Sequence, residues 1–194
     1  MDYKEHISKT IVTAPAVEPV SLAETKTHLR ITASDEDTRL NNLIKAVRMQ
    51  AEELTGRRLI TQTWKAFYAG WPDEYFIIPF PTLQSVTHIK YYDTDGSATT
   101  WSAGNYIVDT DAEPGRVVLG YSKSWPSVTL YPSNPIEIQF VCGYGAAASN
   151  VPEELRQAML IGIERLYDKP HESYDKLLKD VFESILTNFI NYGV

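Results

Sequence analysis

The sequence contains few of the residues that build disulfides and metal sites. One cysteine, Cys142, occurs in 194 residues, so an internal disulfide is excluded and the chain suits a reducing cytoplasm. Cys142 ends a run of β-branched and aromatic residues, where a small buried thiol is expected. The four histidines lie far apart, without the close spacing of metal ligands. We therefore expect no metal ion, and nothing in the sequence indicates a cofactor.

Positive charge and long apolar runs are also scarce. Lys and Arg number 18 against 25 Asp and Glu, which gives a formal net charge of −7. This balance argues against a protein that holds nucleic acid by neutralising its phosphates, although DNA can still pass beside an acidic surface. No segment reaches the length that spans a bilayer, and the N-terminus lacks the apolar run of a signal peptide. We expect no membrane contact.

Catalytic motifs are missing as well. The sequence has no phosphate-binding glycine loop, no dinucleotide fingerprint and no nucleophile elbow. Asp109, Asp111 and Glu113 resemble paired catalytic carboxylates, but we favour a polar turn before Pro114 and Gly115 as their explanation. The four tryptophans could stack on sugars or bases, but such residues more often pack in a core. We predict no enzyme and no catalytic residue, and a carbohydrate-binding or host-recognition module remains the alternative function.

Helical signals dominate the first part of the chain. Residues 1–19 contain prolines without periodicity and predict an extended N-terminal arm. Ser21 and Glu24 form a capping box for a short helix to about residue 30. Residues 34–37 repeat an acidic cap, and apolar positions then recur at helical spacing until Gly56. Residues 20–58 are thus expected to form the first half of a helical scaffold.

Residues 59–149 predict an inserted β subdomain, because aromatic and β-branched runs alternate with turn residues. Strands are expected at 61–68, 75–78, 86–92, 106–108, 116–119 and 136–142, which favours a small antiparallel barrel or sandwich. Asp95 and Gly96 predict the two-residue turn of a hairpin. A calcium loop starting at Asp93 fails, because glycine and glutamate are absent from its sixth and twelfth places.

Residues 150–194 predict the second half of the scaffold, so the fold class is α+β, with about four helices and an inserted β subdomain. The last helix is expected at about 173–192. Its apolar band is wider than one packing face requires, so it either completes the core or contacts another molecule. The band contains Leu178, Phe182, Ile185, Leu186, Phe189 and Ile190.

A series of short motifs follows one order along the chain. They are SLAETKTHLR at 21–30, DED at 35–37, AEELTGR at 51–57, TQTW at 61–64, PFP at 79–81, SV at 85–86, YYDTDG at 91–96, NY at 105–106, PGR at 114–116, WP at 125–126, IEIQFVCGYG at 136–145 and VP at 151–152. In this order and spacing, over about residues 18–168, the chain resembles the head-to-tail connector (adaptor) proteins of long-tailed bacteriophages, in their larger members with a β insertion.

The resemblance implies a structural role without enzymatic activity. About twelve copies are expected to form a ring beneath the capsid portal in the virion neck, after synthesis in the host cytoplasm. The ring would extend the channel through which DNA passes without sequence-specific binding. Its expected partners are the portal protein, further copies of itself, and the next connector or tail-completion protein. We assign portal binding to the six apolar residues of the C-terminal band.

Overall fold

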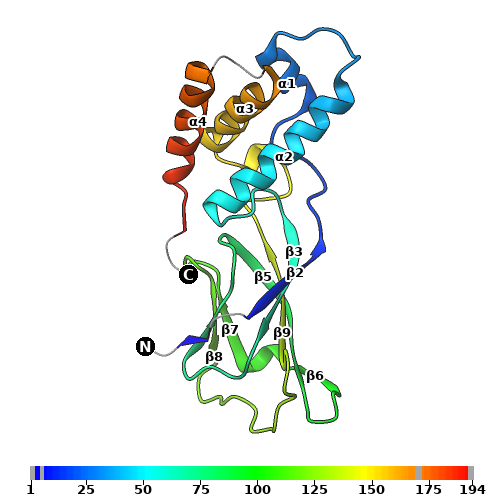
Figure 1. The fold of residues 1–194 in the computed structure, drawn as a ribbon. Helices are drawn as coiled ribbons and strands as arrows, with labels where there is room; N and C mark the ends of the chain where they lie inside the picture. The colour runs from blue at the N-terminus through cyan, green and yellow to red at the C-terminus, as the bar shows by residue number, and fades with distance from the viewer. Residues whose placement is uncertain (1–2, 5–6, 169–171, 192–194) are drawn as a thin grey trace. The chain divides into compact units, whose positions relative to one another are not determined.

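The computed structural model describes residues 3–4, 7–168 and 172–191 of the chain. It divides into two compact units (Figure 1). The β unit takes in the described residues up to 14, residues 61–143 and Asn191, and the helical unit takes in residues 15–60 and 144–190. The α+β class expected from the sequence is confirmed.

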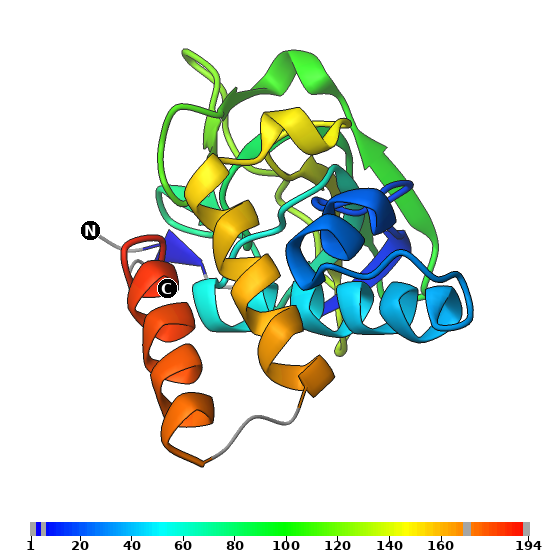
Figure 2. The same cartoon turned by 90° about the horizontal axis from the view of Figure 1, so that it is seen from above.

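The helical unit contains four α-helices in the part of the chain that is described. These are α1 (Leu22–Leu29), α2 (Asp37–Thr55), α3 (Glu153–Asp168) and α4 (Glu172–Thr187). Helix α3 contacts each of the other three, and Figure 2 shows it between α4 and α1. Their buried faces form one apolar core, in which residues from both ends of the sequence meet, such as Ile44 and Val47 with Ile163 and Phe182.

The two predicted helix starts differ in outcome. At α1 the capping box is confirmed: the Ser21 hydroxyl accepts a hydrogen bond from the Glu24 amide at 3.1 Å, and the Glu24 carboxylate accepts one from the Ser21 amide at 2.8 Å. At α2 the predicted side-chain cap is wrong, because the N-cap residue is Glu36 and its side chain bonds no helix amide. Glu36 instead accepts hydrogen bonds from Arg39 and Tyr167.

The β unit contains two open sheets. Its strands are β1 (Tyr3–Lys4), β2 (Ser8–Thr13), β3 (Gln62–Tyr68), β4 (Tyr75–Ile77), β5 (Leu83–Tyr92), β6 (Ala98–Trp101), β7 (Tyr106–Asp109), β8 (Arg116–Leu119) and β9 (Ile136–Cys142). One sheet has the order β1-β4-β8-β7 and the other β2-β3-β9-β5-β6. All neighbours are antiparallel except β1 and β4.

Both sheets contribute to one core, as a sandwich requires. Tyr68 and Ile138 come from the larger sheet, and Phe76 and Val117 from the smaller one. All four are fully buried. Neither sheet closes on itself among the described strands, so the sandwich alternative holds and the barrel alternative does not.

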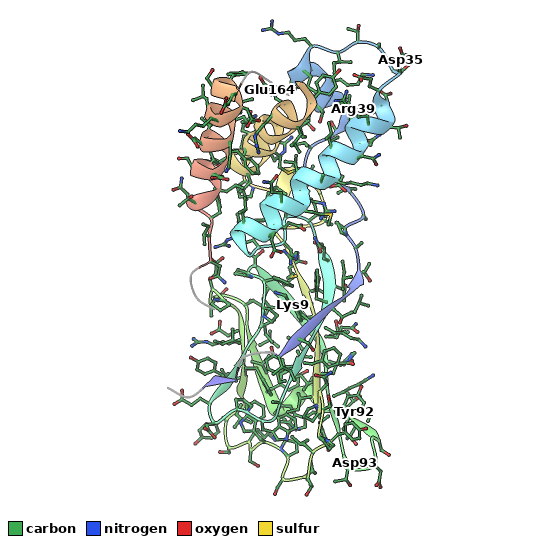
Figure 3. All side chains as sticks on the ribbon, in the orientation of Figure 1. Lys9, Asp35, Arg39, Tyr92, Asp93 and Glu164 are labelled. Atoms are coloured by element: carbon green, nitrogen blue, oxygen red, sulfur yellow. The ribbon has the colours of Figure 1, made fainter. Side chains whose placement is uncertain are left out.

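The predicted hairpin is present, but its turn is longer than two residues. Strands β5 and β6 pair from Tyr92 with Ala98 onwards, so residues 93–97 form the loop. The Asp93 carboxylate accepts hydrogen bonds from the amides of Asp95 and Ser97 at 3.0 and 2.9 Å, while Gly96 supplies a φ of 77°. Figure 3 shows Tyr92 and Asp93 at this end of β5. Hydrogen bonds to the Asp93 side chain therefore shape this turn.

Candidate interaction surfaces

The charged clusters of the structure join separate segments within each unit. Within the described ranges, no three or more His, Cys, Asp or Glu side chains are grouped so as to hold a metal ion. The same residues include no helix with the length and hydropathy of a membrane span. Cys142 is fully buried in the core of the β unit, as expected.

Arginine side chains join distant segments of the helical unit. Arg48 on α2 contacts Glu18 at 2.7 Å and Glu52 at 2.8 Å. The Glu52 carboxylate also accepts a hydrogen bond from the Leu59 amide at 3.0 Å. Because Arg48 and Glu52 are buried, each charge needs its partners. This network holds the chain on either side of α2.

A second arginine, Arg156, joins α1 to α3 by ion pairs. Arg156 forms ion pairs with Glu24 on α1 and Glu153 on α3, and its Nε donates to the Pro19 carbonyl at 3.0 Å. The bonds from Ser21 to Glu24, and then the Arg156 charge, lower the pKa of that carboxyl below its ordinary value. The capping box is thus part of the contact between two helices.

Glu137 is the buried charge of the β unit. It accepts from Lys65 Nζ and His88 Nε2, each at 3.0 Å, and from the Tyr92 hydroxyl at 3.4 Å. Burial opposes its ionisation, yet the hydrogen bonds from His88 and Lys65 outweigh burial and lower the pKa of Glu137. Glu137 lies on β9 and its partners lie on β3 and β5, so the cluster joins the three middle strands of the larger sheet.

The tryptophans pack against one another instead of forming a platform. Trp71 stacks on Trp125 with ring centroids 5.4 Å apart, and Trp101 lies 5.1 Å from Trp125. Trp64 meets Phe80 edge to face at 4.8 Å. These contacts agree with the interpretation that the tryptophans pack in a core. It gives no support to a sugar-binding surface.

The six residues assigned to portal binding fall into two groups. Leu178, Phe182 and Leu186 are buried, and Phe182 and Leu186 belong to the core of the helical unit. Gly162 on α3 makes room for one of them, since a Cβ there would lie 3.1 Å from the ring of Phe182. The other three, Ile185, Phe189 and Ile190, are partly exposed.

Helix α4 also ends earlier than expected. Its last residue is Thr187, so Phe189 and Ile190 follow the helix instead of continuing it. Arg57 fixes this exit, because its Nε donates to the Phe189 carbonyl at 2.7 Å. The predicted helix end at about residue 192 is therefore wrong.

An open groove of about 560 Å³ lies between the start of α3 and the end of α4. Its apolar walls come from Ile185 and Phe189, while Glu153 and Glu154 stand at the first turn of α3. Two of the assigned residues thus line a concave surface. A second apolar surface lies on the outer face of α4, where Tyr174, Leu177 and Val181 are exposed.

Comparison with known proteins confirms the resemblance found in the motifs. Residues 19–110 match the family model described as phage gp6-like head-tail connector protein. This is a family of structural connectors, which agrees with the non-enzymatic role expected. The sequence matches none of the curated proteins with which it was compared.

Solved structures extend the likeness to nearly the whole chain. A protein in the neck of the empty gene transfer agent particle, computed with C6 symmetry, has a TM-score of 0.80 at 22% identity, covering 97% of both chains. A protein in the virion of the native particle gives 0.76 at 21% identity, and one in its neck with C12 symmetry gives 0.73 at 21%, each covering 97% of both chains. At this identity the likeness establishes a shared fold.

Proposed function

We propose that this chain is a structural head-to-tail connector in the neck of a phage-like particle. The observation that carries the proposal is the combination of the connector family match over residues 19–110 with the neck-protein fold over 97% of the chain. A family match to the α1–β7 region alone would leave α3 and α4 unassigned. The fold likeness includes these helices, so both units take part in the proposed connector.

The working form is a ring around the DNA channel. Neck proteins with the same fold were computed with C6 and C12 symmetry, and we propose about twelve copies here. The net charge of −7 suits a channel along which DNA slides, because like charges do not retain the phosphate backbone. The ring then offers its free side to the next connector or to a tail-completion protein.

We further propose that the C-terminal region binds the portal protein. Leu178, Phe182 and Leu186 are buried in their own unit, while Ile185, Phe189 and Ile190 are half-buried and keep part of their apolar surface accessible to a partner. The groove beside them combines apolar walls with two carboxylates. It therefore suits an apolar portal segment that carries basic residues at its border.

Electron microscopy of the purified protein mixed with the portal protein of the same particle tests the connector role. We expect closed rings attached to the portal. If neither rings nor binding is found, the connector proposal is wrong.

Point variants test the portal-binding region separately. Ile185→Ser together with Phe189→Ser should weaken portal binding by about tenfold or more, which is the size of effect expected at an interface centre. Leu177→Ser together with Val181→Ser on the outer face of α4 is the matched control and should leave binding unchanged. Thermal unfolding by circular dichroism must show both double variants folded. If the two double variants bind the portal protein equally well, the portal contact lies elsewhere on the chain, and the connector proposal still stands.

A further inference from the structure

Strand β2 is an unguarded edge of the larger sheet. It pairs with β3 on one side, and no described strand lies on its other side. All six of its residues are exposed, including Ile11 at 45% and Val12 at 47%. Edge strands of this length normally carry protection against pairing with other chains.

Strand β2 has few of the features that normally stop an edge strand from pairing with another chain. The strand contains no proline and one charged residue, Lys9. The Lys9 ammonium lies 4.5 Å from the centre of the Phe80 ring within the same unit (Figure 3 labels Lys9), so it turns towards its own sheet. One bulge interrupts the register between Ile11 and Thr13, which leaves residues 8–11 as a regular pairing segment.

Strand β6 is the opposite edge of the same sheet. It is uncharged, and Ala98, Thr99 and Thr100 are exposed. The pairing register places Ser8, Phe67, Glu137, Lys90 and Thr100 in one row across the sheet. The four successive antiparallel pairings bring β6 back to the direction of β2.

These two edges complement each other between copies. When a second copy is related to the first by rotation about an axis parallel to the strands, its β6 can lie beside β2 of the first copy and run in the same direction. Thr100 of the second copy is then level with Ser8 of the first. Each copy then uses a different edge towards each neighbour, which is the heterologous contact that closes a cyclic ring. Main-chain hydrogen bonds of an added strand supply the contact.

We infer that neighbouring copies in the ring join by parallel pairing of β2 of one copy with β6 of the next, so that the larger sheet continues around the ring. The inference rests on the ring proposed above. It names the partner of β2 as a second copy of this chain, in preference to a strand from the portal or tail. We choose a second copy because β6 is also an edge of the larger sheet and runs in the same direction as β2.

Disulfide cross-linking within rings assembled on portal tests the pairing. Because the single cysteine, Cys142, is buried, introduced cysteines are the reactive ones. Ser8→Cys with Thr100→Cys, and Thr10→Cys with Thr100→Cys, place thiols on both edges of one chain. The two edges are four strand spacings apart, about 19 Å, so a disulfide within one chain is impossible. Oxidation should give a ladder of covalent multimers that a reductant dissolves.

The matched control is Ser8→Cys with Asn42→Cys on the exposed side of α2, which should give no ladder. A charge test accompanies it: Ser8→Lys with Thr100→Lys should reduce ring formation, and Ser8→Lys with Thr100→Glu should restore it. Rings in the electron microscope without cross-links from either pair, or without the charge effect, overturn the inference and leave the connector proposal standing. The absence of rings from the unmodified protein overturns both.

Discussion

The helical unit and the β unit leave different kinds of surface open. In the helical unit the backbone groups are hydrogen-bonded mostly within each helix, so a partner would meet side chains. These side chains form the groove at Ile185 and Phe189 and the outer face of α4. In the β unit the buried side chains form one aromatic core, and the larger sheet also leaves backbone groups accessible along its edge strands β2 and β6. The first kind of surface selects a partner by shape and charge, and the second accepts another strand.

The two units also differ in how distant segments are held together. Arg48 and Arg156 join the helices by side-chain ion pairs, whereas the strands are joined by ladders and one buried cluster at Glu137. The difference predicts that the units respond separately to mutation. All four tryptophans lie within residues 61–143, so their fluorescence reports on the β unit and helical circular dichroism reports on the other.

The largest effect is expected from removing the β unit. Deleting residues 1–14 and replacing 61–143 with a short Gly/Ser linker should leave a helical protein that unfolds cooperatively. A short linker suffices, because the Tyr144 amide donates to the Leu59 carbonyl at 3.3 Å. Circular dichroism at helical wavelengths measures the outcome. Loss of the helical signal would show that the helices depend on the β unit.

Phe182→Ala should destabilise the helical unit by about 3–5 kcal/mol, the range for truncating a buried Phe. The ring is buried against α2 and α3, at Val47 and Gly162. The helical transition should move to lower denaturant concentration, and the tryptophan transition should move less. Leu177→Ala, at an exposed position of the same helix, is the control. Equal shifts of both probes would contradict independent units.

Glu137→Gln should cost the β unit about 1–3 kcal/mol near neutral pH, because Lys65 and His88 lose a charged partner. The native pKa of Glu137 is lowered from 4.5, so its ionisation stabilises the fold above 4.5, and this contribution disappears as the pH falls through the native pKa. The difference between wild type and variant should therefore shrink in acid. Urea unfolding followed by tryptophan fluorescence at about pH 7 and at successively lower pH values well below 4.5 measures it.

The control for this charge is Asp95→Asn in the exposed hairpin loop, which removes one carboxylate from the same unit without removing a partner of Lys65. A difference for Glu137→Gln that stays constant with pH would refute the assigned role of its charge.

The smallest effect separates the two predicted caps. Ser21→Ala should destabilise the helical unit by about 1 kcal/mol, a typical cost for a lost N-cap. Ser34→Ala should have nearly no effect, because α2 begins after Glu36 without a side-chain cap. Chemical denaturation followed by circular dichroism resolves the pair. Equal costs would mean that the helix start at α2 is capped in solution.

Local signals made much of this fold predictable from sequence. The capping box at Ser21 and Glu24, the glycine at position 56 and the six expected strands each depend on residues close together in the chain. Pairing between distant segments was less predictable. Strand β2 lies within the expected extended arm, and its assignment requires β3, whose paired residues lie fifty or more positions away. Strand β6 is not predicted by the sequence, because Ala98 and the polar residues beside it resemble a loop.

The C-terminal surface shows the same limit. The apolar positions continue past Thr187, so the pattern alone favoured a longer helix, yet a contact from Arg57 to the Phe189 carbonyl accompanies its end. Which residues of the band are buried depends on α3, whose Gly162 admits Phe182. Sequence identified the band but could not divide it into core and accessible residues. Portal binding by this region stays a prediction.

The division of the helical unit between two stretches of sequence has a consequence during synthesis on the ribosome. Residues 61–143, with β2 already made, can complete the β unit before α3 emerges. Helices α1 and α2 must wait, with Ile44 and Val47 uncovered, until α3 and α4 follow. Because exposed apolar surface invites aggregation in unfinished chains, the nascent protein is most vulnerable between the release of α2 and the arrival of α3.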